Sequence, residues 1–190
     1  GGKQITSNYA SFIAMPKGKN YVYVWGYNGQ GRLGTGNTDN QVTIRRVELP
    51  GVVKNVWHNQ SFTSSMEGYS FIQLENNDIY FAGYSGNGQN ALGTTPSSVP
   101  TFTKVPVLSG KDIEEIIVTA YFTMFAKVKK PNNLYDIYGW GYNNIGVIGT
   151  GGNNNSILTP TLVAENVSSF DTTMWGSSYG GSGNSYYVYA

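Results

Sequence analysis

Side chains that could do covalent or metal chemistry are few in this chain. It has no cysteine and one histidine, His58, which excludes cysteine nucleophiles, thiolate zinc sites, iron–sulfur clusters and histidine-rich metal centres. The aspartates fall singly without the spacing of a calcium loop, and the adjacent Glu114 and Glu115 would face opposite sides of a strand. His58 has no strand–turn–helix serine elbow to accompany it. The sequence therefore predicts a protein that is not an enzyme and has no metal site and no cofactor.

One glycine motif has the letters of a dinucleotide-binding fingerprint. Residues 29–34 read Gly-Gln-Gly-Arg-Leu-Gly, but a nucleotide site needs a helix after the motif, whose N-terminus meets the pyrophosphate. The residues that follow, Thr-Gly-Asn-Thr-Asp-Asn at 35–40, are turn formers. We therefore interpret the glycines as a tight loop between strands.

Aromatic residues in two enlarged polar stretches are candidate ligand contacts. We expect both stretches, residues 57–68 and 175–184, to be enlarged loops, and both surround their aromatic rings with small polar side chains. Such rings can stack on a sugar while amides and hydroxyls bond its hydroxyl groups; the alternative is a long surface loop without a ligand. The predicted ligand-binding residues are Trp57, Phe62, Trp175 and Tyr179.

The charge balance limits the classes of partner. Twelve basic and eleven acidic residues leave a net charge of +1, and only 12% of residues are charged. A chain with so little positive charge is not expected to bind nucleic acid through its phosphates. No apolar run reaches the ~20 residues of a membrane span, so membrane insertion is not expected. The uncharged surface, rich in Gly, Asn, Ser and Tyr, is typical of extracellular or virion-surface β proteins.

The chain contains an internal repeat of almost constant length. Trp25-Gly26-Tyr27-Asn28 returns as Trp140-Gly141-Tyr142-Asn143, and a related copy, residues 82–85, lies between them. The first glycines of the three copies are 57 and 58 residues apart. A Leu/Ile-Gly-Thr marker follows each copy, so chance does not explain the pattern.

Each repeat is predicted to contain four β-strands. The segments 21–25, 79–81 and 134–138 are aromatic or β-branched and end in a loop rich in Gly and Asn. A weaker, edge-type strand follows the loop, and two further strands complete the period. Trp25 and Trp140 are expected to be buried between repeats. The fold class is therefore all-β, with four-stranded blades of the size found in β-propellers.

The motif at residues 24–36, Val-Trp-Gly-Tyr-Asn-Gly-Gln-Gly-Arg-Leu-Gly-Thr-Gly, resembles the repeat of the regulator of chromosome condensation family. This resemblance implies a β-propeller, usually of seven blades. The repeat count here gives about three and a half blades within a single domain. The expected boundaries are 3–50, 51–108 and 109–165, with a partial blade at 166–190. The first blade is predicted to open with strands at 4–6 and 10–15, and the partial blade to contain strands at 167–175 and 185–190. Because a partial ring exposes edge strands, we expect a homo-oligomer or a longer parent chain.

The sequence leaves several functions open. Our first prediction is a non-enzymatic recognition module that binds a cell-surface glycan or a protein receptor, as in a bacteriophage tail fibre or a secreted adhesin. The alternative is a protein–protein interaction scaffold or a secreted protein inhibitor of the same propeller class. The resemblance also implies guanine-nucleotide exchange or a chromatin role, which the nearly neutral charge makes less favoured. Fold alone does not choose among these functions.

Overall fold

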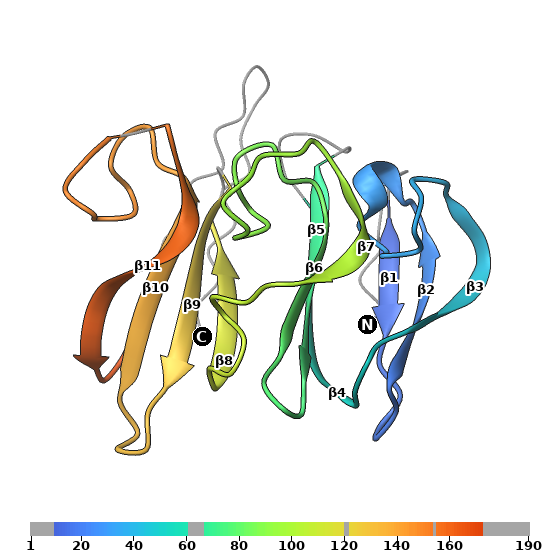
Figure 1. Ribbon diagram of the computed structural model, residues 1–190, viewed down its shortest axis with the longest axis horizontal. Helices are drawn as coiled ribbons and strands as arrows, with labels where there is room; N and C mark the ends of the chain where they lie inside the picture. The colour runs from blue at the N-terminus through green and yellow to red at the C-terminus, as the bar shows by residue number, and fades with distance from the viewer. Residues whose placement is uncertain (1–9, 61–66, 120–121, 154, 173–190) are drawn as a thin grey trace, which may run out of the picture.

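The computed structural model of the chain describes residues 10–60, 67–119, 122–153 and 155–172, which form three antiparallel sheets standing side by side (Figure 1). The single helical segment in these residues is the 3-10 turn η1 (Gly29–Gly31). The predicted all-β fold is therefore confirmed. We call the sheets blades 1, 2 and 3 in chain order.

Consecutive strands are neighbours in every blade, so each blade is an up-and-down meander. Blade 1 consists of β1 (Ser11–Ala14), β2 (Tyr21–Gly26) and β3 (Gln41–Glu48). Blade 2 consists of β4 (Val53–Gln60), β5 (Gly68–Leu74), β6 (Ile79–Gly83) and β7 (Val99–Lys104). Blade 3 consists of β8 (Ile113–Val118), β9 (Thr123–Lys129), β10 (Tyr135–Tyr142) and β11 (Ser156–Val167). Blades 2 and 3 have the four strands predicted for a repeat.

The hydrophobic pattern explains why the blades stack. β2 alternates, with Val22 and Val24 fully buried and Tyr23 exposed on the opposite face, as expected for a strand with one covered face. β5 is buried at every position, because blade 2 has a neighbour on each side and both faces of β5 are covered. Blade 1 is therefore amphipathic at β2, and blade 2 is buried on both faces at β5.

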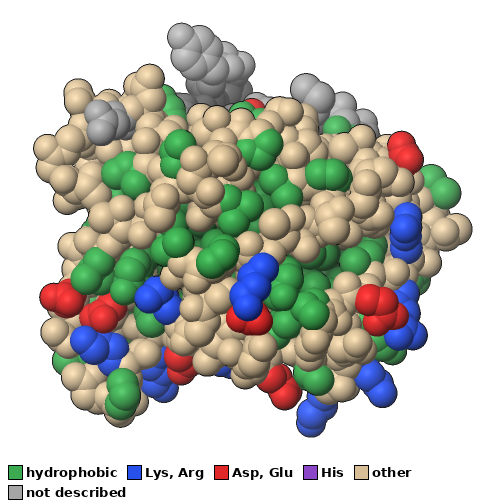
Figure 2. Space-filling view, viewed as in Figure 1, with side chains coloured by type: hydrophobic (Ala, Val, Ile, Leu, Met, Phe, Trp, Pro, Cys, Tyr) green, Lys and Arg blue, Asp and Glu red, His purple; other side chains and the backbone are tan. Residues whose placement is uncertain are grey.

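The core is divided into two seams, each between neighbouring blades. The first seam joins blades 1 and 2 through Val22, Val24, Leu33, Ile72 and Phe102. The second seam joins blades 2 and 3 through Phe71, Phe81, Val105, Met124 and Trp140. Other hydrophobic side chains are visible at the surface over the middle of the molecule (Figure 2).

The two repeat tryptophans differ in burial, and the prediction for Trp25 was wrong. Trp140 is fully buried, with its ring 6.2 Å from that of Phe71 in the preceding blade. Trp25 is only partly buried and stacks on Phe12 of its own blade, with the ring centroids 5.1 Å apart. The difference follows from position, since a preceding blade covers Trp140, whereas blade 1 is the first blade of the described residues.

Most of the predicted partial fourth blade, residues 166–190, lies outside the described residues, which end at residue 172. β11 continues to Val167, and residues 168–172 form no strand, so the strand expected from Val167 to Trp175 does not begin there. Phe170 instead packs on Phe125 of blade 3, with the ring centroids 5.1 Å apart. The predicted strands at residues 4–6 and 185–190 lie outside the described residues.

Candidate functional site

The two ends of the blades differ in chemistry. β2, β6 and β10 all run toward one end, the loop end, where the three Gly/Asn-rich loops begin (Figure 1). The turns that join β1 to β2, β5 to β6 and β9 to β10 lie at the other end, the hairpin end. On the face shown in Figure 2, charged side chains gather toward the hairpin end, and the loop end is mostly uncharged. The loop end is therefore the less ionic of the two surfaces.

A row of aromatic residues marks the loop end. Tyr27, Tyr84 and Tyr142 are half-buried and occupy one equivalent position in the three blades. Each backbone N–H donates to a carbonyl of the neighbouring strand segment, at 2.9 Å for Tyr27, 2.9 Å for Tyr84 and 3.2 Å for Tyr142. The ring of Tyr84 lies 5.7 Å from that of Phe122. Aromatic side chains with one buried and one accessible face are enriched in protein interfaces.

The structure places one of the four predicted ligand-binding residues, Trp57. It lies within β4, paired in register with Phe71 of β5, and its partly buried side chain packs against the seam between blades 2 and 3. The expectation that a loop begins at Trp57 was therefore wrong, because the strand continues to Gln60. Phe62, Trp175 and Tyr179 lie outside the described residues, and their role in binding stays a prediction.

His58 sits in a polar contact between blades 1 and 2. Its Nε2 lies 2.7 Å from Ser11 Oγ in β1, and its Nδ1 lies 2.7 Å from Ser70 Oγ in β5. Ser70 Oγ in turn donates to the backbone carbonyl of Arg32, 2.5 Å away. Burial and the nearby Arg32 charge lower the pKa of His58 to about 4, so the ring is neutral at pH 7.

These contacts do not form a catalytic triad. Both ring nitrogens of His58 face serine hydroxyls, whereas a triad needs a carboxylate on one nitrogen and a free nucleophile on the other. Ser70 is fully buried, with its hydroxyl hydrogen directed at a backbone carbonyl. We therefore assign Ser11, His58 and Ser70 to the structure of the seam between blades 1 and 2.

Sequence reasoning missed Arg32, whose side chain is fully buried at the loop end. Its Nε donates to the carbonyl of Gly29 at 3.2 Å, and its guanidinium lies 4.9 Å from the ring centroid of Tyr27. Burial lowers the pKa of Arg32. The third repeat has the apolar Val147 two residues before its Gly-Thr marker, where the first repeat has Arg32. That difference was the available signal of a buried charge.

The glycine motif forms the tight loop that was predicted. Gly31 and Gly34 have positive φ angles of 76° and 68°, a conformation that favours glycine. Asn28 stabilises the loop with two side-chain hydrogen bonds. Its Oδ1 accepts from Leu33 N and its Nδ2 donates to the carbonyl of Asn37, both at 2.9 Å. Only the three-residue turn η1 lies in the motif, so it offers no helix N-terminus to a pyrophosphate.

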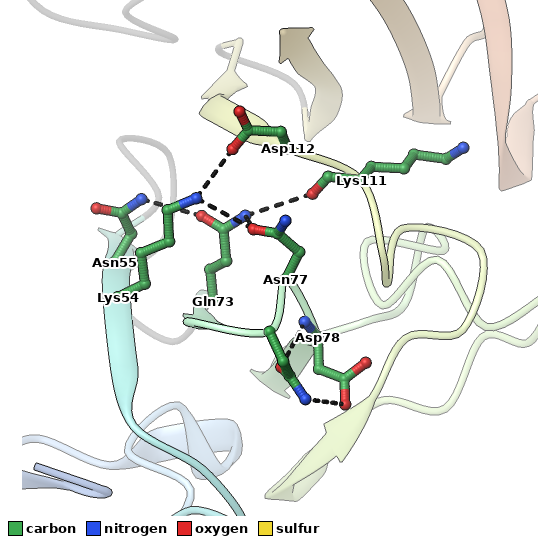
Figure 3. A network of polar contacts seen from close by, with 8 residues as sticks. Lys54, Asn55, Gln73, Asn77, Asp78, Lys111 and Asp112 are labelled. Atoms are coloured by element: carbon green, nitrogen blue, oxygen red, sulfur yellow. Dashed lines mark hydrogen bonds and ion pairs between the residues drawn. The ribbon is translucent and has the colours of Figure 1, made fainter. Parts of the chain in front are cut away.

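A polar network at the hairpin end joins blades 2 and 3 (Figure 3). Gln73 is fully buried; its Oε1 accepts from Asn55 at 3.0 Å, and its Nε2 donates to the carbonyl of Lys111 at 3.4 Å. Lys54 reaches Asp112 at 2.9 Å. In Figure 3 these side chains point toward one another from both blades, so the network is structural.

The described residues contain no group of three or more His, Asp or Glu side chains that could hold a metal ion. Within the same residues, no helix has the length and apolar character needed to cross a bilayer. The half-buried tyrosines, one per blade, make the loop end the candidate functional site.

Comparison with known proteins relates these blades to a known repeat. Residues 19–64 match the family described as the regulator of chromosome condensation (RCC1) repeat. Residues 19–64 therefore resemble an RCC1 repeat, and the three sheets have the fold of the blades in RCC1-type β-propellers.

The similar curated proteins are themselves larger. The chain is 32% identical over 153 residues to the ultraviolet-B receptor UVR8 of Arabidopsis thaliana, covering 78% of this chain and 30% of that protein. It is 27% identical over 127 residues to the RCC2 homolog of Xenopus laevis, covering 66% of this chain and 22% of that protein. The chain thus spans less than a third of these relatives.

Solved structures show the same fold. Prp20p from Saccharomyces cerevisiae, described with its binding properties to Gsp1p and histones, superposes with a TM-score of 0.62 at 17% identity, covering 82% of this chain and 36% of that one. Human WBSCR16 superposes with a TM-score of 0.60 at 18% identity, covering 82% and 37%. At these identities the likeness establishes the propeller fold and nothing more specific.

Proposed function

We propose that this chain is a non-enzymatic protein-interaction module that contacts its partner with the loop end of the blades. The observation that carries the proposal is the row of Tyr27, Tyr84 and Tyr142, one per blade, on a surface with few charges. The repeat places the three rings at the same strand end, so a partner can meet them together. Tyrosines supply large contact area at low entropic cost.

The relatives support the same class of function. RCC1-type proteins in the comparisons include Prp20p, described as binding Gsp1p and histones and solved in complex with Kap60. The alternative of a protein-interaction scaffold therefore has more support than the first prediction of glycan or host attachment, which none of the relatives named above supports. An extracellular or virion-surface location stays a prediction.

The net charge of this chain argues against transferring the histone partner directly. Histones are strongly basic, so a binding surface for them requires an acidic field, whereas this chain carries a net charge of +1. We therefore propose a partner that presents an apolar and polar, uncharged surface. Binding of this kind changes little with salt, because few ion pairs are screened.

The test is quantitative affinity capture with matched variants. The immobilised 190-residue chain is compared with the double variant Tyr84→Ala and Tyr142→Ala in cell extract, at 50 and 300 mM salt. We expect the double variant to capture at least tenfold less of a partner protein than the parent chain does. The amount that the parent chain captures should change little between the two salt concentrations. Circular dichroism establishes that both proteins are folded.

The matched control is placed at the hairpin end. Glu75 and Lys129 are exposed there, and the double variant Glu75→Ala and Lys129→Ala should capture the same protein as the parent chain. If this control loses capture, or if the tyrosine variant retains it, the loop end is excluded as the partner-binding surface. A glycan array is run in parallel, and tight binding to a defined sugar without protein capture would support the attachment function instead.

A further inference from the structure

The glycine-rich loop of one blade docks on the last strand of the next blade. At the first such junction, Gly31 of blade 1 lies against Pro100 of β7, so closely that a Cβ on Gly31 would overlap the Pro100 backbone. The N–H of Gly36 donates to the carbonyl of Pro100 at 2.9 Å. Thr35 and Thr101 form an isolated antiparallel bridge beside this contact. The loop of blade 1 therefore extends the edge of blade 2.

The same junction recurs between blades 2 and 3. Gly88 of the second loop lies against Leu158 of β11, where an added Cβ would come within 2.7 Å of Leu158 Cδ2. The N–H of Gly93 donates to the carbonyl of Leu158 at 3.1 Å. Two copies of one contact show that loop-to-strand docking is the rule by which these blades are joined.

Strand register identifies the equivalent receiving site on blade 1. Pro100 follows Val99, which pairs with Gly83, and Leu158 follows Ile157, which pairs with Gly141. In blade 1, Gly26 pairs with Gln41, so the equivalent residue on β3 is Val42. Val42 is 94% exposed. No described loop covers the site where the two other blades receive a glycine.

A second position on β3 shows the same contrast. Counting from the same register, Ile44 is equivalent to Phe102 of β7. Phe102 lies against Gly34 of the preceding loop and is 9% exposed, whereas Ile44 is 65% exposed. The outer strand of blade 1 thus presents an apolar receiving surface, Val42 and Ile44, to solvent.

The loop of blade 3 is the complementary half of such a junction, a loop without a strand to receive it among the described residues. Gly146 and Gly149 have φ angles of 74° and 83°, close to those of Gly31 and Gly34 in the docked first loop. Its turns are closed by the same bonds, from Gly146 N to the carbonyl of Asn143 and from Gly149 N to the carbonyl of Gly146, both at 3.0 Å. The loop is therefore built as in blade 1.

Nothing in the described residues covers this third loop. A Cβ on Gly149 would meet no atom within 4 Å. Ile145 and Val147, which flank Gly146, are 78% and 46% exposed. The loop thus has the conformation of a docked loop and an apolar, uncovered surface.

We propose that a second copy of this chain supplies the missing partner, with the 145–149 loop of one copy docked on Val42 and Ile44 of the next. The two halves cannot meet within one chain, because blade 1 and the blade 3 loop lie at opposite ends of the row of blades (Figure 1). Each copy carries one half of the junction at each end, and both halves are apolar. The contact is heterologous, so it produces a ring where the rotation closes.

Size-exclusion chromatography with light scattering tests the proposal on the 190-residue chain. The molar mass measured for the parent chain should rise with concentration to at least twice the mass of one chain. The strand variant Val42→Asp and the loop variant Ile145→Asp should each weaken association at least tenfold. Both residues are largely exposed, so their melting temperatures at low concentration should equal that of the parent. Leu162→Asp, at a 40% exposed apolar position on β11, is the matched control and should associate like the parent.

Mixing the two variants separates docking from general surface effects. The strand variant keeps an intact loop and the loop variant keeps an intact strand, so one intact junction can form only in the mixture. We expect the mixture to give a complex of two chains while each variant alone stays single. A parent chain that remains single at all concentrations, variants that associate normally, or a mixture without a complex would each overturn the proposal.

Discussion

The indole Nε1 of Trp140 donates a hydrogen bond to the backbone carbonyl of Gln89, 3.0 Å away across the seam between blades 3 and 2. The same ring is fully buried against Phe71 of blade 2. One side chain thus joins the strand of its own blade to both the loop and the sheet of the preceding one. The repeat tryptophan is therefore a connection between blades.

Replacement of Trp140 should cost much more stability than replacement of Trp25. Trp140→Ala removes a buried ring and leaves a cavity, a change that costs ~3–5 kcal/mol. Trp25 is partly exposed and stacks on Phe12, so Trp25→Ala should cost less than about half of that. Urea denaturation followed by circular dichroism measures both free energies of unfolding, and equal losses would contradict the difference in burial.

Stability should fall between pH 6.5 and pH 4 because of His58. Its folded-state pKa of about 4 lies below the ordinary value of ~6.5, so the unfolded chain binds the proton more tightly in that window. The free energy of unfolding therefore rises with pH from 4 to 6.5 and is reduced on acidification. A shift of this size corresponds to up to about 3 kcal/mol, measured as urea midpoints at pH 4.5 and 7.

The control for this pH dependence is His58→Asn, which removes the titrating ring. Burial raises the pKa of Glu67, which acts with the opposite sign, so only the difference between parent and variant isolates His58. We expect the variant to have the shallower pH dependence. Parallel curves for the two proteins would show that His58 is accessible and protonates freely in the fold.

Removal of the amide inside the third loop should destabilise the protein, whereas removal of its neighbour should not. Asn143 is fully buried, accepting from Ile148 N at 3.0 Å and donating to the carbonyl of Gly152 at 3.2 Å. Asn143→Ala leaves the buried backbone N–H of Ile148 unsatisfied and should cost ~1–3 kcal/mol. Asn144 is exposed, and Asn144→Ala should stay within ~0.5 kcal/mol. Thermal melts of the two variants make the comparison.

The hairpin-end network should depend on its buried amide more than on its ion pair. Gln73→Ala removes the acceptor for Asn55 and the donor to the Lys111 carbonyl and should cost ~1–3 kcal/mol. Asp112→Ala breaks the ion pair with Lys54. The side chain of Lys54 is 36% exposed and that of Asp112 is 53% exposed, and such exposed pairs contribute ~0–1 kcal/mol. Denaturant titrations at low and high salt distinguish the two contributions. A larger loss for Asp112→Ala would reverse this ranking.

The fold could be predicted from the sequence because the same pattern of strands and loops occurs in each repeat. Strand periodicity at Val22 and Val24 and the recurring Trp-Gly-Tyr-Asn motif at two positions each indicate the same architecture. The prediction for Trp25 failed for a physical reason. A repeat motif specifies which face a side chain occupies, and burial depends on whether another blade covers that face.

The candidate site was less predictable. Tyr27, Tyr84 and Tyr142 were visible as repeat residues, but their accessibility depends on how Gly29 and Gly86 approach the rings of Tyr27 and Tyr84 in three dimensions. Trp57 was expected in a loop because small polar residues follow it, although the strand pairing of β4 with β5 continues past it to Gln60. Pairing with a distant strand is a tertiary effect that local composition does not show.

Because the core lies in seams between neighbouring blades, the folding of this chain is close to a one-dimensional process. The middle blade has a partner on both faces, as the complete burial of β5 shows, and each outer blade shares one described seam. Amide hydrogens of β5 and β6 should therefore exchange with solvent last, and those of β1 and β3 earlier. Unfolding then begins at the ends of the row and spreads inward, so any molecule that covers an end blade slows the exchange of the whole chain.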